Sequence, residues 1–225
     1  SFIAVLNLII DRAPIIPKDK ANDDLIVKTI KNIAKEKNAN LIYASTQKCY
    51  ASDLKGEYQK ENINTVITAI KQLQKQGWAI TENNIEQGLL ETVANTQLLG
   101  RWQTLSSNPQ IICDTAHNED GIKEITKQLR NLKYEQLHIV FGTVDDKNLD
   151  TILTYLPKNA KYYFCNANIL RAMKAVDLKQ KSDKHQLKGR IFPSVREALK
   201  CAKINANPND LIFVGDSTFV VAEVV

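Results

Sequence analysis

The sequence predicts an α/β protein whose C-terminal part is a doubly wound, mainly parallel sheet. From residue 99 onward, short apolar runs of strand length alternate with amphipathic stretches of helical period. The runs are apolar throughout rather than alternating with polar residues, which is typical of parallel strands covered by helices on both faces. A length of 225 residues with 44% hydrophobic side chains suits two small domains. We expect these domains at residues 1–98 and 99–225, on either side of a break in the pattern at Gln97–Trp102.

The first part of the chain carries a mixed helix and strand pattern. Its predicted elements are, in order, a helix over 21–38, a strand over 40–45, a loop over 46–60, and helices over 61–76 and 81–95. Gly77 ends the second helix, and Thr81 begins the third as its N-cap. The apolar opening Ser1–Ile10 has no basic region before it and no small-residue cleavage pattern after it. We therefore expect a segment of a longer chain here rather than a signal peptide.

The second part alternates strands and helices as a Rossmann-like sheet requires. Its predicted strands are 111–114, 137–142, 161–166, 190–192 and 211–215, and its helices are 119–132, 149–156, 172–181 and 195–204. In such a sheet, ligands bind beyond the carboxyl ends of the strands. The residues that directly follow each strand are therefore the first candidates for a functional site.

Composition argues against several classes of partner. The net charge of +5 is spread along the chain without a run of like charges, which favours a solvated surface over a nucleic-acid groove. No stretch approaches ~18 consecutive apolar residues, so no membrane span is expected. No two of the four cysteines form a CxxC pair, which argues against a metal knuckle and suits a reducing cytoplasm.

Three strand ends carry polar clusters. Asp114 ends one apolar strand and His117 follows it, Ser217 follows the last strand, and residues 145–147 combine two carboxylates with Lys147. Each cluster also has a structural interpretation, because Asp114 and Ser217 can act as helix caps, His117 as a surface residue and 145–147 as a solvated turn. The three together favour a shared cleft. The sequence contains no GxxxxGK[ST], GxGxxG, GxSxG or HExxH motif that would complete a catalytic site.

The motifs in combination resemble those of folylpolyglutamate/dihydrofolate synthases, which belong to the Mur ligase superfamily. The matching segments, within about residues 20–225, are Gln59–Asn62, Leu99–Gln103, Asp114–Asn118, Gly142–Lys147, Arg171–Met173 and Asp210–Ser217. Leu170 stands where the family has a proline. The resemblance implies that residues 1–98 are the tail of a central α/β ATPase domain and that 99–225 form the C-terminal domain of such a ligase.

The resemblance also implies an activity. In the family, ATP phosphorylates a substrate carboxylate, and the amino group of L-glutamate attacks the acyl phosphate to give an amide. The expected substrates are ATP, L-glutamate and dihydropteroate or folate polyglutamates. ATP and Mg²⁺ would be bound mainly by a region with a phosphate-binding loop, which this sequence lacks, so we expect the chain alone to be inactive. Family members are generally monomers, so we expect a monomer here, and we expect a cytoplasmic protein from its cysteines.

The resemblance assigns roles to six residues. Asn62 would contact the adenine, Arg101 the nucleotide, and Asp114 the ribose or its neighbourhood. His117 and Ser217 would line the glutamate side of the cleft as the catalytic candidates, and Lys147 would contact an anion. No metal ligand is assigned.

Two other functions fit the same residues. The chain can belong to another Mur-type ligase that joins amino acids to a cell-wall precursor or a related polymer. It can also be a non-catalytic α/β module that binds a nucleotide or a partner protein. A GxxGKx segment upstream of these residues in the gene would exclude the binding module.

Overall fold

The computed structural model describes residues 15–16, 24–44, 48–145 and 149–225, and the chain divides into two compact units. The first unit contains the described residues up to Asp53 together with Glu57–Gln97. The second contains Leu54–Gly56 and Leu98–Val225. Leu54–Gly56 belong with the second unit, where Gln128 Nε2 donates a hydrogen bond of 3.2 Å to Lys55 O. The apolar opening Ser1–Ile10 lies outside the described residues.

The first unit pairs a short parallel sheet with helices. Its elements are β1 (Ile15–Ile16), α2 (Asp24–Glu36), β2 (Ile42–Tyr43), α3 (Gln59–Lys75), α4 (Glu82–Leu90) and α5 (Thr92–Thr96). Ala44, directly after β2, packs against Ala69 of α3, with Ile42 and Leu73 beside them. Thr81 caps α4 as predicted, since its Oγ1 accepts from Asn84 N at 3.2 Å.

The single helix predicted over 81–95 is instead two helices, and Asp53 is the cause. In a continuous helix the carbonyl of Leu89 would accept a hydrogen bond from Val93 N. Leu89 O accepts from Asp53 N at 3.2 Å instead, and Val93 N donates to Asp53 Oδ2 at 2.8 Å. Asp53 thus binds both the carbonyl of Leu89 and the N–H of Val93, which would otherwise bond to each other. The helix is therefore interrupted between α4 and α5.

The second unit contains a six-stranded sheet of order β3-β4-β8-β5-β6-β7. Its strands are β3 (Gln103–Ser107), β4 (Gln110–Asp114), β5 (Leu137–Phe141), β6 (Lys161–Phe164), β7 (Gly189–Ile191) and β8 (Leu211–Gly215). Strands β4 to β8 pair in parallel, which confirms the predicted sheet. The edge strand β3 was not predicted; it pairs antiparallel with β4. Its sequence QTLSS is mostly polar, so it lacks the apolar run that marks a buried strand.

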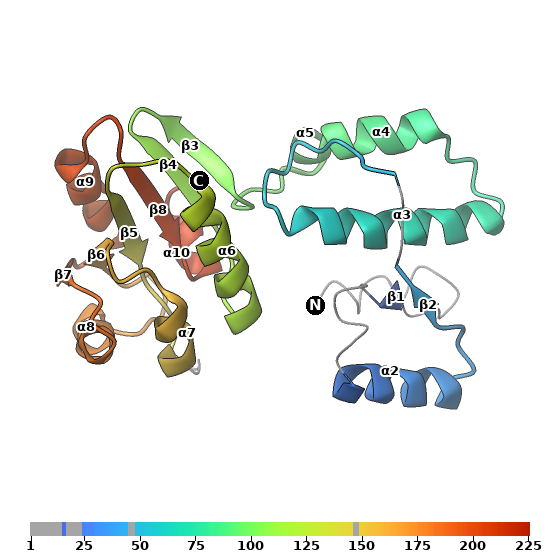
Figure 1. Ribbon diagram of the computed structural model, residues 1–225, viewed down its shortest axis with the longest axis horizontal. Helices are drawn as coiled ribbons and strands as arrows, with labels where there is room; N and C mark the ends of the chain where they lie inside the picture. Colours follow the sequence, from blue (N-terminus) through green and yellow to red (C-terminus); the bar gives the residue numbers. More distant parts are fainter. Residues whose placement is uncertain (1–14, 17–23, 45–47, 146–148) are drawn as a thin grey trace. The chain divides into compact units, whose positions relative to one another are not determined.

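Helices cover both faces of this sheet (Figure 1). They are α6 (Glu119–Asn131), α7 (Leu149–Tyr155), α8 (Ala175–Lys184), α9 (Val195–Asn205) and α10 (Thr218–Ala222). On one face, Val195, Ala198 and Ala202 of α9 and Val220 of α10 share a core with alternate strand residues such as Val140. On the other side of the sheet lies α6, as Figure 1 shows. Burial on both faces explains why β5 and β8 are apolar throughout.

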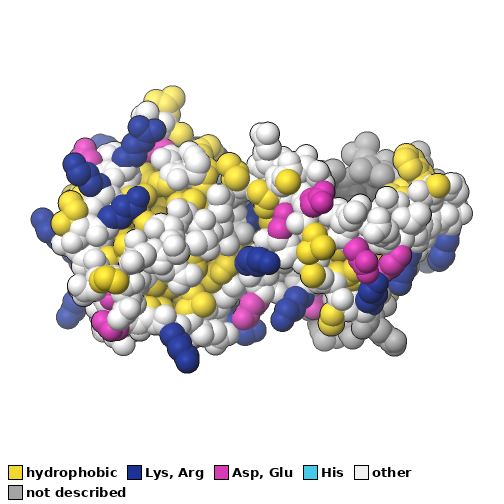
Figure 2. All heavy atoms as spheres, turned by 90° about the horizontal axis from the view of Figure 1, so that it is seen from above, with side chains coloured by type: hydrophobic (Ala, Val, Ile, Leu, Met, Phe, Trp, Pro, Cys, Tyr) yellow, Lys and Arg dark blue, Asp and Glu magenta, His cyan; other side chains and the backbone are white. Residues whose placement is uncertain are grey.

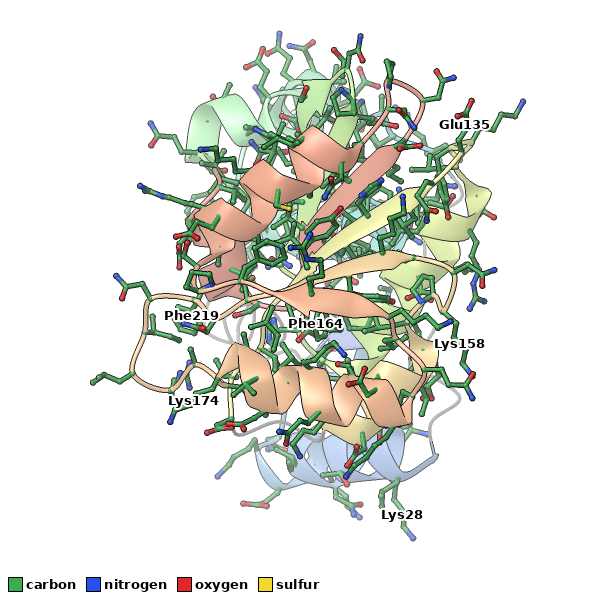
Figure 3. The ribbon with its side chains drawn as sticks, turned by 90° about the vertical axis from the view of Figure 1, so that its left-hand side faces the viewer. Lys28, Glu135, Lys158, Phe164, Lys174 and Phe219 are labelled. Carbon is green, nitrogen blue, oxygen red and sulfur yellow. The ribbon has the colours of Figure 1, made fainter. Side chains whose placement is uncertain are left out.

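The parallel register aligns the carboxyl ends of the strands in one row. Gly215 at the end of β8 is paired with Asp114 on one side and with Phe141 on the other, and Phe141 is paired in turn with Phe164. Figure 3 shows this edge of the sheet on the side of Phe219, whereas Glu135 and Lys158 lie toward the opposite edge. The residues that follow β4, β8, β5 and β6 therefore emerge side by side.

Candidate functional site

The row of carboxyl ends brings together the strand ends that carry Asp114, His117 and Ser217. Asp114 and Gly215 are direct partners in the sheet, so the segments after β4 and β8 leave from neighbouring positions. The segment after β5 is the next along the row. The site therefore consists of the loops at this edge of the second unit.

Asp114 is 1% exposed, and both oxygens of its carboxylate accept backbone hydrogen bonds. Oδ2 accepts from Trp102 N at 2.7 Å, and Oδ1 accepts from Ala116 N at 2.8 Å. Thr115 N donates to Gly100 O at 2.9 Å, so two hydrogen bonds hold residues 100–102 against the end of β4. The first structural role of Asp114 is therefore to fix this turn.

The turn exposes Arg101, whereas the neighbouring Trp102 is buried. Gly100 and Trp102 have φ of 73° and 48°, in the left-handed region, and Arg101 between them is exposed. The Trp102 ring is 6% exposed and packs near Phe213, with 6.3 Å between ring centroids. Trp102 thus anchors the turn in the core, while the Arg101 side chain is directed to solvent at the edge of the sheet.

His117 lies three residues beyond Asp114, the buried end of β4, and is exposed. Its Nδ1 lies 3.0 Å from Thr115 O, and a carbonyl oxygen can only accept, so Nδ1 carries the hydrogen. In the neutral ring the lone pair is then on Nε2. Asn118 caps α6 through a hydrogen bond of 2.8 Å from Gly121 N to its Oδ1, which fixes the backbone next to His117.

Ser217 is 4% exposed and caps the short helix α10. Its Oγ accepts from Phe219 N at 3.2 Å. A hydroxyl that accepts through its oxygen still has a hydrogen to donate. The residue before it, Asp216, has φ of 74°, so the chain turns sharply between β8 and α10.

Asn62 and Lys147 are not among the described residues of the second unit. Asn62 belongs to the first unit, is exposed on α3, and donates from Nδ2 to Oε1 of buried Gln59 at 2.8 Å. That hydrogen bond fixes the orientation of the Asn62 amide. Lys147 lies outside the described residues.

The structure adds Arg171, which sequence reasoning did not place in the site. Arg171 lies in the β6–α8 loop (residues 165–174), and its Cζ is 5.0 Å from the centre of the Phe219 ring, a cation–π distance. Asp145 N donates to Arg171 O at 3.1 Å, and Met173 N donates to Thr143 O at 3.0 Å. The loop is thereby tied to the end of β5. A single arginine in an irregular loop has no periodicity that would reveal this position, and the only sequence signal was the resemblance of Arg171–Met173 to a segment of the family.

The described residues offer no metal site. In residues 15–16, 24–44, 48–145 and 149–225, no group of three or more His, Cys, Asp or Glu side chains is placed to hold an ion. The helices in these ranges include none that is long and apolar enough to cross a membrane. In Figure 2 the Lys and Arg side chains are dispersed over the face shown.

The part of the chain that carries these strand ends matches a known protein family. Residues 100–215 match the family model described as "Mur ligase, glutamate ligase domain". The dihydrofolate synthase/folylpolyglutamate synthase of Escherichia coli is 28% identical over 211 residues, covering 88% of this chain and 48% of that protein. A probable bifunctional folylpolyglutamate synthase/dihydropteroate synthase of Haloferax volcanii is 29% identical over 173 residues, covering 76% of this chain and 20% of that protein.

Solved structures have the same fold. E. coli FolC in complex with ADP, without folate substrate, has a TM-score of 0.71 at 26% identity, covering 88% of this chain and 50% of that one. E. coli FolC in complex with DHPP and ADP has a TM-score of 0.75 at 24% identity, covering 95% of this chain and 52% of that one. The chain therefore spans about half the length of the E. coli protein.

Proposed function

Since the chain belongs to the Mur ligase family through the glutamate ligase domain that its residues 100–215 match, we propose that it is part of an ATP-dependent ligase. The ligase adds L-glutamate to dihydropteroate, to folate polyglutamates, or to both. The observation that carries the proposal is the turn at residues 100–102, which Asp114 holds so that Arg101 is exposed at the edge where His117 and Ser217 also lie.

The proposed reaction has two steps. First, a carboxylate oxygen of the pteroate or folate substrate attacks the γ-phosphorus of ATP, and the bond from phosphorus to the β–γ bridging oxygen breaks. This step gives ADP and an acyl phosphate. Second, the amino nitrogen of L-glutamate attacks the acyl carbon, the carbon–oxygen bond to phosphate breaks, and the nitrogen loses a proton. The products are an amide, ADP and phosphate.

Two residues contact the nucleotide in this proposal, and Asp114 positions one of them. Asn62 pairs with adenine through its fixed amide, since an asparagine can donate to N7 and accept from the N6 amino group. Arg101 contacts the phosphates or ribose with a planar, permanently charged donor. Asp114 contributes through the turn that places Arg101, because its two oxygens accept from Trp102 N and Ala116 N.

His117 and Ser217 act on the glutamate side. Nε2 of the exposed His117 ring can accept the proton that the attacking amine loses, because Nδ1 is held as the donor to Thr115 O. Ser217 donates its hydroxyl hydrogen to a carboxylate of the amino acid while its oxygen accepts from Phe219 N. Lys147 keeps the anion contact that the resemblance implies. The divalent cation that accompanies ATP is bound mainly by the region that carries the phosphate-binding loop.

We expect the 225-residue chain to show no turnover alone, because its sequence has no phosphate-binding loop of the GxxxxGK[ST] type. The test therefore uses the full-length protein that contains these residues. The assay measures ADP release that depends on both L-glutamate and a pteroate or folate substrate.

Arg101→Ala, Asp114→Ala and His117→Ala should each lower kcat/KM at least tenfold, which corresponds to ~1.4 kcal/mol of transition-state stabilisation. Arg190→Ala removes an exposed arginine on β7 and is the matched control. Near-normal kinetics for all three variants would refute the site. Turnover with a different acceptor, but not with pteroate or folate, would favour another ligase of the family.

A further inference from the structure

A cavity of about 520 Å³ lies at the carboxyl ends of β6 and β7, within the second unit. Three segments line it: Asn166–Ile169 after β6; Pro193, Ser194 and Arg196 at the start of α9; and Glu223 directly after α10. Asp114, His117 and Ser217 are not among the lining residues, although Asn166–Ile169 belong to the same β6–α8 loop as Arg171. The volume is within the ~300–1,000 Å³ of small-ligand pockets.

The walls of the cavity are fixed by hydrogen bonds. Asn168 N donates to Glu223 Oε1 at 2.8 Å, which joins the β6–α8 loop to the end of α10. Ile169 N donates to Ala167 O at 2.8 Å, so the loop turns tightly there. Ser194 caps α9, with its Oγ accepting from Glu197 N at 3.2 Å. The backbone around the cavity is therefore held in place by hydrogen bonds.

The lining carries one charge of each sign. Arg196, in the first turn of α9, is cationic, and Glu223 is a half-buried carboxylate. The described residues include no ion pair between Arg196 and Glu223. Glu223 Oε1 accepts from Asn168 N, and the Glu223 charge adds to burial in raising the pKa of the Cys165 thiol. Asn166, Asn168 and Ser194 add neutral polar groups. Such a lining complements a ligand that has both an ammonium and a carboxylate.

We infer that this cavity is a second binding site, for a small zwitterionic amino acid, beside the proposed cleft. The carboxylate of the ligand pairs with Arg196 at the N-terminal end of α9, where the helix dipole also favours an anion. Its ammonium pairs with Glu223. The cavity and Ser217 lie at the same edge of the sheet. The inference rests on the proposed function only for the choice of L-glutamate as the probe.

The test is a titration of the 225-residue chain with L-glutamate, followed through backbone amide NMR signals. We expect the signals of Asn168 and Arg196 to shift, with Kd on the order of 1 mM. Arg196→Gln should weaken this binding about tenfold, whereas Lys200→Gln, which removes an exposed cation from the same helix, should leave it unchanged. Glutarate, which lacks the ammonium, should bind about tenfold more weakly than L-glutamate.

Two further variants separate the cavity from the cleft. Glu223→Gln keeps an acceptor for Asn168 N but removes the charge, so it should abolish the preference for L-glutamate over glutarate. His117→Ala changes an exposed side chain outside the cavity and should leave the shifts at Asn168 and Arg196 intact. Shifts confined to residues 114–118 and 215–217, or cavity shifts that persist in Arg196→Gln, would overturn the inference. Shifts confined to residues 114–118 and 215–217 would leave the proposed function unaffected. An inactive full-length ligase whose cavity still binds L-glutamate would contradict the proposed function but support the second binding site.

Discussion

At the scale of single residues, the Asp114 carboxylate decides where Arg101 lies. Its two oxygens accept from Trp102 N and Ala116 N, so one side chain joins the turn before β3 to the segment after β4. A carboxylate can accept at both oxygens, whereas an amide presents one acceptor and one donor. The site therefore needs an aspartate at this position for its geometry as well as for its charge.

Asp114→Asn should lower the free energy of unfolding by about 1–3 kcal/mol, because one buried backbone N–H would then face an NH₂ group. Urea denaturation of the 225-residue chain measures the change. Asp177→Asn is the control, since Asp177 is exposed on α8. Equal stability of the two variants would contradict the role assigned to Asp114.

Gly100 is required by both its backbone and its surroundings. Its φ is 73°, and a Cβ there would lie 2.7 Å from Val221 Cγ1 and 2.8 Å from Thr115 Cγ2. Gly100→Ala should therefore destabilise the second unit by about 1–3 kcal/mol. Gly88→Ala should have the opposite sign and stabilise α4 by about 0.5–1 kcal/mol, because Gly88 is helical with open space around it. Thermal melts of both variants check the pair, and a stabilised Gly100→Ala would refute the argument.

At the scale of elements, a buried polar network joins three strands, near the amino ends of β5 and β8. His138 on β5 is 0% exposed; its Nδ1 lies 2.9 Å from the Tyr163 hydroxyl on β6, and its Nε2 lies 3.2 Å from Asp210 Oδ2 before β8. The carboxylate can only accept, so Nε2 carries the hydrogen and Nδ1 accepts from Tyr163 in the neutral ring. Burial lowers the pKa of His138, although Asp210 opposes this effect.

The lowered pKa of His138 predicts acid sensitivity. The unfolded chain binds a proton at His138 near its ordinary pKa of about 6.5, whereas the folded chain binds it only at lower pH. Protonation of His138 therefore has no effect on the free energy of unfolding above pH ~6.5, and it lowers this free energy as pH falls below that value.

Urea midpoints measured from pH ~7.5 to ~5 should decline less in His138→Gln than in the wild type. His185→Gln, at a histidine near the surface that lies 3.3 Å from Asp150, is the control and should follow the wild type. Parallel declines in the wild type and His138→Gln would exclude His138 as the cause.

At the scale of the whole molecule, two of the four cysteines lie in the core of the second unit. Cys113 and Cys165 are both 0% exposed, and burial raises the pKa of each thiol to about 12. Cys49 is exposed and Cys201 is half-buried. Only a thiolate reacts with an alkylating reagent, so the two buried thiols are protected by both access and protonation.

Iodoacetamide at pH ~8 should modify Cys49 first, and should modify Cys113 and Cys165 only at the rate at which the sheet opens. Mass spectrometry of peptides gives the order. In urea all four cysteines should react at similar rates, which is the control. Modification of Cys113 as fast as Cys49 in native buffer would show that the sheet is not closed around it.

The parallel strands and the edge that carries the site could be predicted from sequence. Strands β4, β5, β6 and β8 are short runs of mostly buried side chains. Asp114 ends one such run, and His117 and Ser217 lie within three residues of a strand end, so local pattern was enough. The edge strand β3 was missed because its residues are polar and its pairing with β4 is what orders it. The break between α4 and α5 was missed because Asp53, which causes it, is 40 residues away from Val93.

By itself, the sequence determined the α/β class, the parallel sheet, the strand ends that hold the candidate residues and the motifs of the family. All of these depend on residues within one element or directly after it, where periodicity and short-range hydrogen bonding act. The tertiary structure alone decided that Asp114 fixes the turn of Arg101, that Arg171 lies over Phe219, and that Arg196 and Glu223 share a cavity. These contacts join residues from different elements, and only the packing of the folded chain brings such residues within hydrogen-bond or van der Waals distance.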